Sequence, residues 1–311
     1  MKAMCTITIF VGFLALLCQN AEACWPVPDQ AGHVTIPDGD AEIKPYQLAT
    51  CEPKLKSITI PNSVKSIGSG AFDGSALTEV NIPNGVTTIK KNAFKGCSNL
   101  TSVTLPDSLL TIEQGAFVGT ALTKLVIPNS VTSLGEGFCQ NLANLESVTI
   151  GNSVSAIAVN AFRGCTRLAS VTLPASLKTI GEYAFFQCKS IKSLTLPYGV
   201  TSIGKSAFHV AGLTRVNIPG TVTEIGEDAF VTFSAGVDIQ CDKQCETGEP
   251  ACNPECNING CTVARLKEVS CPGTGNCPDT AQCKELSNSA NVPTLSLAVT
   301  SVLVFACAAF A

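Results

Sequence analysis

An internal repeat is the feature that most constrains what this chain can fold into. The phrase Leu-x-x-Ile-x-Ile-Pro-Asn-x-Val-x-x-Ile-Gly-x-x-Ala-Phe recurs in eight copies, whose starts are 22 or 23 residues apart. The starts are Leu55, Leu77, Leu100, Leu122, Leu145, Leu168, Ile191 and Leu213. One phenylalanine lies near the end of each copy: Phe72, Phe94, Phe117, Phe138, Phe162, Phe185, Phe208 and Phe230. Self-similarity at this period indicates a solenoid with one coil per repeat.

Each repeat is predicted to hold two short extended segments and one short helical turn. In the first repeat, Ile58 and Ile60 alternate with hydroxyl residues, which is the period of a strand with one buried side. A proline follows and ends the strand, because it has no N–H to donate. The second segment carries further aliphatic residues, and the Ala-Phe pair after it suits a helical turn whose ring fills the core. Neighbouring coils must stack, since one repeat alone buries too little to be stable.

Both ends of the solenoid should be capped, because an open end exposes core and unpaired strand edges. Residues 24–54 are predicted to be an N-terminal capping coil. There, Val34-Thr35-Ile36-Pro37 matches the first strand and proline of a repeat, and the following residues do not match the second half. The segment from Val237 to Ile239 predicts a last half-coil. The solenoid itself is assigned to residues 55–240.

The repeat phrase, as it stands in Leu100–Pro106 and Ile112–Phe117, closely resembles the BspA-like leucine-rich repeats of surface proteins in bacteria and microbial eukaryotes. The resemblance covers Leu55 to about Phe233. It implies a leucine-rich-repeat solenoid with short parallel β-strands and a short helical turn per coil. It also implies that the cysteines three residues after the repeat phenylalanine are small buried residues: Cys97, Cys165 and Cys188. We expect free thiols at these positions, and a bridge between Cys165 and Cys188 of adjacent coils is the alternative.

Two repeats depart from the phrase. The fourth is one residue short before Phe138 and one residue long after it. We expect a local bulge between Gly135 and Asn144 there, without loss of register. In the fifth repeat, Gly151 replaces the proline.

The N-terminal residues carry a signal for export. Residues 1–23 are predicted to be a secretory signal peptide, because an apolar run from Ile7 to Cys18 precedes the small-x-small pattern Ala21-Glu22-Ala23. Cleavage would leave Cys24 as the first residue. A bacterial lipoprotein, lipidated at Cys24, is an alternative, but Ala21 stands where such proteins usually have leucine.

The C-terminal residues indicate membrane attachment. A polar spacer at 284–294 precedes an uncharged apolar tail at 295–311. As a helix this tail would span roughly 26 Å, which is short for a hydrocarbon core of about 30 Å. It therefore resembles the signal for a glycosylphosphatidylinositol anchor, with Ser287, Asn288 and Ser289 as candidate attachment sites. A retained membrane helix is the alternative, and both predict a location at the extracellular face of the plasma membrane.

Cysteine usage favours an oxidising compartment. Three of the seventeen cysteines lie in the predicted signal and tail, and the remaining fourteen form an even set. Cys24 and Cys51 are one candidate disulfide pair. Residues 241–283, which contain few apolar residues, hold the other candidates: Cys241, Cys245, Cys252, Cys256, Cys261, Cys271, Cys277 and Cys283. Four bridges would stabilise this segment, which we interpret as a stalk. A zinc module is the alternative, but cysteine pairs separated by two residues and a nearby histidine are both missing.

Charge and residue types argue against several functions. The formal net charge of −4 gives no basic patch, so no nucleic-acid partner is predicted. The sequence has only two histidines, His33 and His209, and its carboxylates do not recur as pairs. The glycines recur as turn residues of the repeat rather than as a phosphate-binding loop. No catalytic residue, metal site or cofactor is predicted.

The outward side of the first strand is the predicted binding face for a protein or glycan. Two polar columns run along it, beginning with Ser57 and Thr59. The charged residues that distinguish one coil from another here are Glu79, Lys124, Glu146, Lys192 and Arg215. The alternative interpretation is that serine and threonine simply suit exposed strand positions. One glycosylation sequon, Asn99-Leu100-Thr101, is present, although Leu100 belongs to a core strand.

The leading hypothesis is a cell-surface protein that mediates adhesion or recognition through its solenoid. A structural coat or cell-wall component that self-associates is the second hypothesis. An enzyme or enzyme inhibitor is the third, and the sequence offers no set of residues for it.

Overall fold

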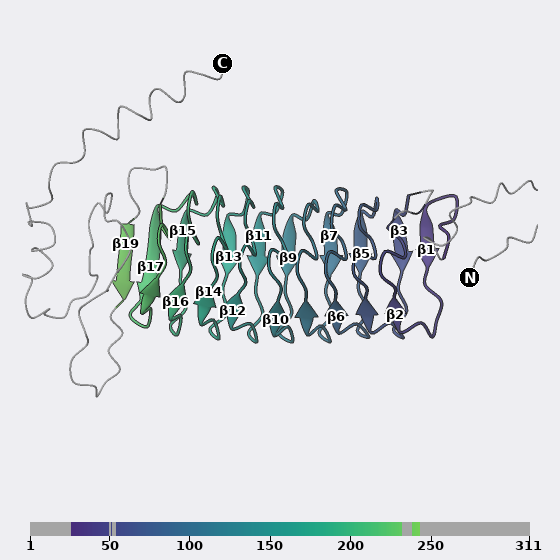
Figure 1. The fold of residues 1–311 in the computed structure, drawn as a ribbon, viewed down its shortest axis with the longest axis horizontal. Helices are drawn as coiled ribbons and strands as arrows, with labels where there is room; N and C mark the ends of the chain where they lie inside the picture. The colour runs from purple at the N-terminus through teal and green to yellow at the C-terminus, as the bar shows by residue number, and fades with distance from the viewer. Residues whose placement is uncertain (1–25, 50, 52–53, 232–237, 243–311) are drawn as a thin grey trace, which may run out of the picture. The chain divides into compact units, whose positions relative to one another are not determined.

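The computed structural model describes residues 26–49, 51, 54–231 and 238–242, which form a β-solenoid with two rows of strands (Figure 1). The odd-numbered strands make one row: β1 (His33–Thr35), β3 (Ser57–Thr59), β5 (Glu79–Asn81), β7 (Ser102–Thr104), β9 (Lys124–Val126), β11 (Ser147–Thr149), β13 (Ser170–Thr172), β15 (Ser193–Thr195), β17 (Arg215–Pro219) and β19 (Asp238–Asp242). The even-numbered strands make the other: β2 (Glu42–Ile43), β4 (Ser66–Ile67), β6 (Thr88–Ile89), β8 (Thr111–Ile112), β10 (Ser133–Leu134), β12 (Ala156–Ile157), β14 (Thr179–Ile180), β16 (Ser202–Ile203) and β18 (Glu224–Ile225).

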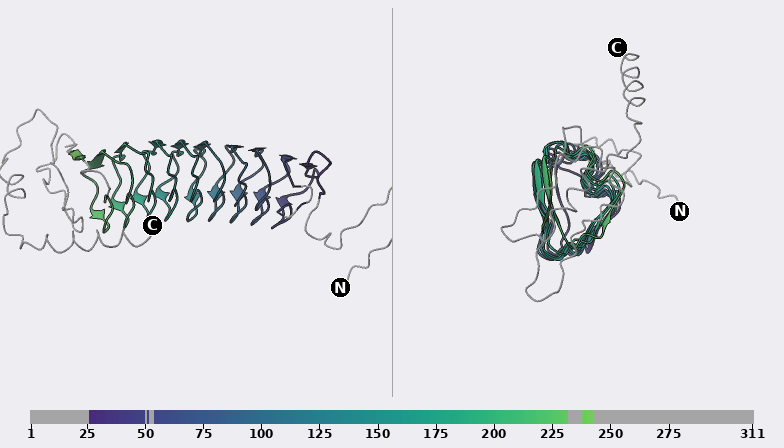
Figure 2. Two further views of the ribbon diagram at one scale, coloured as in Figure 1. Left: turned by 90° about the horizontal axis from the view of Figure 1, so that it is seen from above. Right: turned by 90° about the vertical axis from the view of Figure 1, so that its left-hand side faces the viewer.

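Equivalent strands of neighbouring coils pair in parallel within short sheets, so the solenoid predicted from the repeat is confirmed. The odd row contains four sheets, β1-β3, β5-β7, β9-β11-β13 and β15-β17-β19, and the even row contains two, β2 to β10 and β12 to β18. Lys124 of β9 lies opposite Ser147 of β11, which in turn lies opposite Ser170 of β13. The even-numbered strands pair with the same one-coil offset, as Ile67 does with Ile89. The coils therefore superpose on one another when the solenoid is viewed from its end (Figure 2).

Strands on both sides of the eight repeats pair with them. The N-terminal coil contains β1, which pairs with β3, and also β2, which pairs with β4. Its second half thus forms a strand although it does not match the repeat phrase. At the other end, β19 pairs with β17 over five residues, as expected for a last half-coil.

One continuous hydrophobic core runs through the coils, and a column of phenylalanines lies within it. The repeat phenylalanines from Phe72 to Phe208 are fully buried, and Phe230 in the last full repeat is 8% exposed. Five neighbouring pairs stack face to face with ring centroids 4.9–5.4 Å apart. Aliphatic side chains from both rows of strands surround the column. Each ring therefore completes the core of its neighbour, which is why a single repeat cannot stand alone.

The helical turn predicted around each Ala-Phe pair is wrong, because the described residues contain no helix. In the first repeat the amide of Ala71 donates to the carbonyl of Gly68, three residues back. The next amide, that of Phe72, donates instead to the carbonyl of Ala93 in the following coil. This alternation recurs in later repeats. An α-helix needs every amide to bond within its own segment, so bonds between coils hold this segment as a series of turns.

The bulge predicted in the fourth repeat is also wrong. The amide of Phe138 donates to the carbonyl of Gly135, three residues back, as the alanine of the other repeats does. The amide of Cys139 donates to the carbonyl of Ala161 in the following coil, as the core phenylalanine of the other repeats does. The Ala-Phe pair is thus replaced by Phe138-Cys139, with no residue inserted or lost. Gly151, in place of proline, lies just after β11 and is buried without interrupting the pairing of β11 with β13.

The second residue after the core position has a positive φ in the first seven repeats. Glycine holds it four times, at φ between 70° and 76°: Gly74, Gly96, Gly119 and Gly164. The other three repeats place a side chain there, at φ 61°, 61° and 59°: Asn141, Gln187 and Val210. Val210 is the most strained of these, because a β-branched residue rarely adopts this conformation. Coil stacking, which includes a bond from the amide of Val210 to Val231, imposes it.

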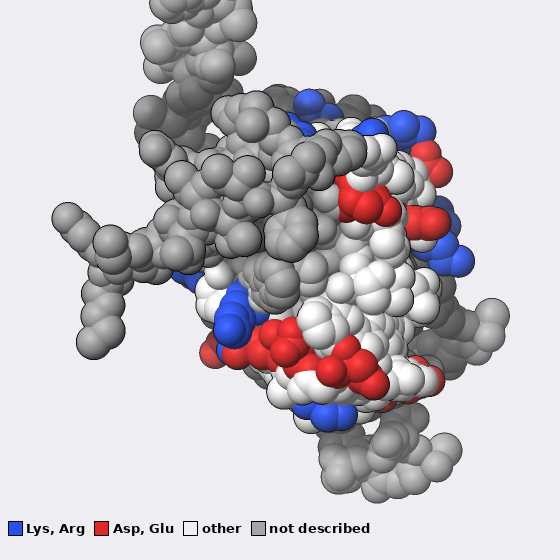
Figure 3. All heavy atoms as spheres, turned by 90° about the vertical axis from the view of Figure 1, so that its right-hand side faces the viewer, with Lys and Arg blue, Asp and Glu red and all other residues white. Residues whose placement is uncertain are grey.

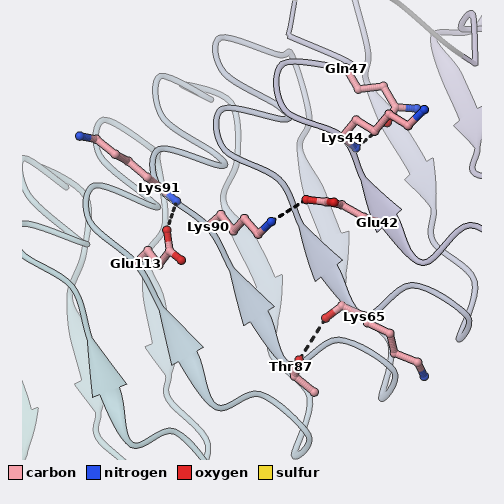
Figure 4. A network of polar contacts seen from close by, with 8 residues as sticks. All are labelled: Glu42, Lys44, Gln47, Lys65, Thr87, Lys90, Lys91 and Glu113. Atoms are coloured by element: carbon pink, nitrogen blue, oxygen red, sulfur yellow. Dashed lines mark hydrogen bonds and ion pairs between the residues drawn. The ribbon is translucent and has the colours of Figure 1, made fainter.

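Side-chain contacts add to the backbone bonds between the first coils (Figure 4). The Nζ atom of Lys90 lies 2.7 Å from Oε1 of Glu42, although these residues belong to coils two apart. A carboxylate oxygen of Glu113 accepts a hydrogen bond from the amide of Lys91 at 2.9 Å. These contacts join the N-terminal coil, the second repeat and the third repeat.

Candidate recognition surface

The outward side chains of the odd-numbered strands form a continuous surface, which we term the odd-strand face. Ser57 belongs to its first column and Thr59 to its second, and β1 adds one residue to each. Paired strands are about 4.8 Å apart, so the polar groups within each sheet repeat at that spacing. The second column is exposed from Thr59 to Thr195, and Val126 is its one large apolar member at 49% exposure. Within each of the four sheets of this row, strand pairing fixes the relative positions of these groups.

His33 extends the first column beyond the residues predicted from the sequence, because β1 places it opposite Ser57. Its Nδ1 atom lies 2.8 Å from Oγ of Ser57, and its Nε2 atom lies 3.3 Å from the hydroxyl oxygens of Thr35 and Thr59. The imidazole therefore links the N-terminal coil to the first repeat through the hydroxyl groups of Ser57 and Thr59. The sequence signal for this position is Val34, which follows His33 and aligns with the first strand of the repeat.

The charged residues predicted for the face fall into two groups. Glu79, Lys124 and Arg215 are exposed and lie within strands β5, β9 and β17. Glu146 and Lys192 are also exposed, but each lies one residue before a strand, at the edge of the face. The carboxylate of Glu146 forms an ion pair with Arg167 of the next coil.

No single sign of charge dominates the N-terminal end of the solenoid. Seen from that end, acidic and basic side chains are interspersed with uncharged surface (Figure 3). The odd-strand face also lacks a dominant charge, because most of its outward side chains carry hydroxyl groups. Hydrogen bonding and shape, rather than a strong electrostatic field, are what such a surface offers to a ligand.

A second polar cluster was missed in the sequence because its members come from three successive repeats. The guanidinium of Arg163 lies over the rings of Phe186 and Tyr183, with its central carbon 5.1 Å and 5.7 Å from their centroids. His209 stacks on Phe186 at 5.4 Å and an interplanar angle of 8°. Arg163, Phe186 and His209 each follow the core phenylalanine of their repeat, and this common position was the available signal. Because its neighbours cover Phe186, the cluster stabilises the coil stack and leaves a partly exposed guanidinium.

The four internal cysteines are buried and free: Cys97, Cys139, Cys165 and Cys188. Burial raises the pKa of Cys97 to about 11 and that of Cys165 to about 12, and it also raises the pKa of Cys139 and Cys188. The thiol of Cys97 donates to the carbonyl of Phe72 at 3.0 Å. These residues therefore act as small core residues, as the resemblance implied.

The other predicted cysteine and anchor sites lie mostly outside the described residues. Cys51 is disulfide-bonded, and its expected partner Cys24 is not described. Cys241 falls in β19, where only the backbone is described, and the stalk cysteines from Cys245 to Cys283 fall outside. The signal peptide and the anchor candidates at 287–289 also fall outside.

Two searches of the described part of the chain gave no candidate. No group of three or more metal-ligating side chains is close enough to hold a metal ion there. In the same ranges, no helix has the length and hydropathy to cross a membrane.

Comparison with known proteins identifies the family. The model for the BspA-type leucine-rich repeat region matches residues 30–143 and 132–259, with 6 copies. A solved leucine-rich repeat protein from Bacteroides ovatus is 26% identical over 66% of this chain and 71% of its own, with a TM-score of 0.41. The leucine-rich repeat protein of T. pallidum is 30% identical over 51% of this chain and 78% of its own, with a TM-score of 0.48. A leucine-rich cell surface protein from Faecalibacterium prausnitzii is 23% identical over 71% and 89%, with a TM-score of 0.31.

A search of the curated proteins found no match. The family match covers well over half of the chain and coincides with the coils of the solenoid. The chain therefore belongs to the family of BspA-type leucine-rich repeat proteins.

Proposed function

We propose that this chain is exported, attached to the membrane through its C-terminus, and binds a protein or a glycan with the odd-strand face. The observation that carries the proposal is the face itself. Exposed hydroxyl, amide and charged side chains lie in register across successive coils on paired strands. Such groups suit many weak hydrogen bonds to one extended partner, because rigid strands hold them in place before binding.

Export and attachment are tested on intact cells that make the native protein. Phosphatidylinositol-specific phospholipase C should release it, and mass spectrometry of the C-terminal peptide should find a glycolipid remnant at Ser287, Asn288 or Ser289. Retention with Ala311 still present would instead support a membrane-spanning tail. A protein found only in the cytosol would contradict the proposal.

Binding is tested with the purified solenoid on an array of glycans and extracellular-matrix proteins. A variant with alanine at Lys124, Lys192 and Arg215 should lose about tenfold in affinity, or about 1.4 kcal/mol. The matched control replaces Lys65, Lys95 and Lys178, which are exposed at other positions of the coils. Equal losses in both variants would show that the odd-strand face is not the binding surface.

A structural coat component is the alternative function, since a repetitive strand surface can also pair with further copies. Sedimentation of the purified protein distinguishes the two. A monomer that binds a soluble partner supports recognition, whereas ordered self-assembly under the same conditions supports the coat.

A further inference from the structure

We infer that Asn99 is a modification site, which carries an asparagine-linked glycan on the folded solenoid. The inference rests on the proposed export, because this modification takes place in the secretory pathway of eukaryotic cells. The sequon Asn99-Leu100-Thr101 supplies the required hydroxyl residue at the second position after the asparagine. The folded structure must then leave room for the sugar.

The local structure turns Asn99 outward although the next residue enters the core. Ser98 and Asn99 form an exposed turn, and Leu100 is fully buried. The amide of Leu100 donates to the carbonyl of Cys97 at 3.0 Å, which closes this turn. The predicted conflict between a core leucine and an accessible sequon is thus absent in the fold.

The neighbouring coils also leave space beside Asn99. The position directly before the first leucine of a repeat is held by Ala76 in the preceding coil and by Ala121 in the following coil. Both side chains are too short to reach over Asn99. The exposure of Asn99 and these short side chains support room for a glycan on its Nδ2 atom.

The fourth repeat supplies a natural comparison. Asn144 occupies the same position, directly before Leu145, and it is exposed in the same way as Asn99. The residue that follows Leu145 is Glu146 rather than threonine, so the fold provides the same setting without the sequon. A comparison of Asn99 with Asn144 therefore shows whether glycosylation depends on the sequon or on the exposed turn alone.

The reaction takes an oligosaccharide from a lipid diphosphate donor. The Nδ2 atom of Asn99 forms a bond to C1 of the first sugar, and the C1–O bond to the diphosphate breaks. The lipid diphosphate leaves with the bonding electron pair, and the amide nitrogen releases one proton. No oxidant or reductant is needed.

The test uses the full chain, with its own N-terminal residues, expressed in eukaryotic cells. Peptide-N-glycosidase should lower the apparent mass of the exported protein by one glycan and convert Asn99 to aspartate. Asn99→Gln and Thr101→Val should abolish the shift, whereas Thr101→Ser should keep it. Glu146→Thr should add a second glycan, at Asn144.

The outcomes separate this inference from the proposed function. Exported protein without a glycan overturns the inference and leaves the proposed location standing. If the chain is not exported, the proposed location fails, and the same variants are then expressed behind the signal peptide of a secreted reporter. Absence of a glycan on Asn99 in that secreted fusion overturns the inference, and its presence supports it. A shift that persists in Asn99→Gln also overturns it.

Discussion

Phe138 packs edge-on against Phe162, with ring centroids 5.3 Å apart and ring planes at 74°. The next pair in the column, Phe162 and Phe185, stacks with an interplanar angle of 14°. The difference follows from the fourth repeat, where Phe138 holds the alanine position and Cys139 holds the position of the core ring. The phenylalanine column is thereby divided into a stack before this repeat and a stack after it.

Restoring the usual order should join the two stacks. The double substitution Phe138→Ala with Cys139→Phe places one ring in the core position and keeps the core volume nearly constant. Each new stacked pair contributes about 0.5–1.5 kcal/mol beyond burial, so we expect the free energy of unfolding to rise by about 1 kcal/mol. Urea denaturation followed by circular dichroism measures it.

The single substitution Cys139→Phe is the control for that pair. It leaves Phe138 in place and puts two rings where the core has room for one. Overpacking should lower the free energy of unfolding by about 1–3 kcal/mol. A double variant that is as unstable as this single variant would show that Phe138 is not in the alanine position.

The strain at the positive-φ position can be measured at Gly74. A Cβ atom added there meets no other atom within 4 Å, so only the backbone conformation opposes a side chain. Gly74→Val should lower the free energy of unfolding by about 1–2 kcal/mol, since φ is 70° at this residue. Gly74→Asn should cost less than half as much, because asparagine tolerates this region. Equal effects of the two substitutions would contradict the assignment of strain.

The buried thiols should resist modification in the folded protein. Cys97, Cys139, Cys165 and Cys188 have raised pKa values, so each remains a protonated thiol well above pH 8. A maleimide reagent should leave all four unlabelled in the native state and label them after unfolding in urea. Labelling before unfolding, detected by peptide mass spectrometry, would show that the core is open.

The same thiols give stability a defined dependence on pH. The pKa of Cys97 is about 11 when folded and near 9.0 when it is unperturbed, as in the unfolded chain. The contribution of this protonated thiol to the free energy of unfolding is therefore fully present below pH 9. It falls by about 1.4 kcal/mol per pH unit as the pH rises from 9 toward 11. Cys97→Ala should remove that part of the slope in urea titrations at graded pH. An unchanged slope would contradict the burial of the thiol.

The ion pair between Lys90 and Glu42 should contribute modestly. Both side chains are more than a third exposed, so solvent screens the pair and a coupling of about 0.2–1 kcal/mol is expected. A double-mutant cycle with Lys90→Met and Glu42→Gln measures it, and high salt should reduce it. A coupling that salt does not change would indicate packing of the two side chains rather than ion pairing.

The sequence by itself determined the repeat length, the inward aliphatic residues, the two rows of strands and the columns of the odd-strand face. These features are local, because a two-residue alternation and a recurring turn identify which side chains a coil buries. The same reasoning located Ser57, Glu79, Lys124 and Arg215 on strands. It also identified the family, which the match over most of the solenoid confirms.

Only the tertiary structure decided the features that depend on bonds between coils. The amide of Phe72 donates to the next coil, which replaces the expected helical turn, and Cys139 rather than Phe138 fills the core position. Arg163 and His209 both contact the ring of Phe186 because stacking brings three repeats together. None of these contacts can be predicted from one repeat alone. Each forms because a hydrogen bond or ring contact to a neighbouring coil lowers the free energy more than the local conformation that it replaces.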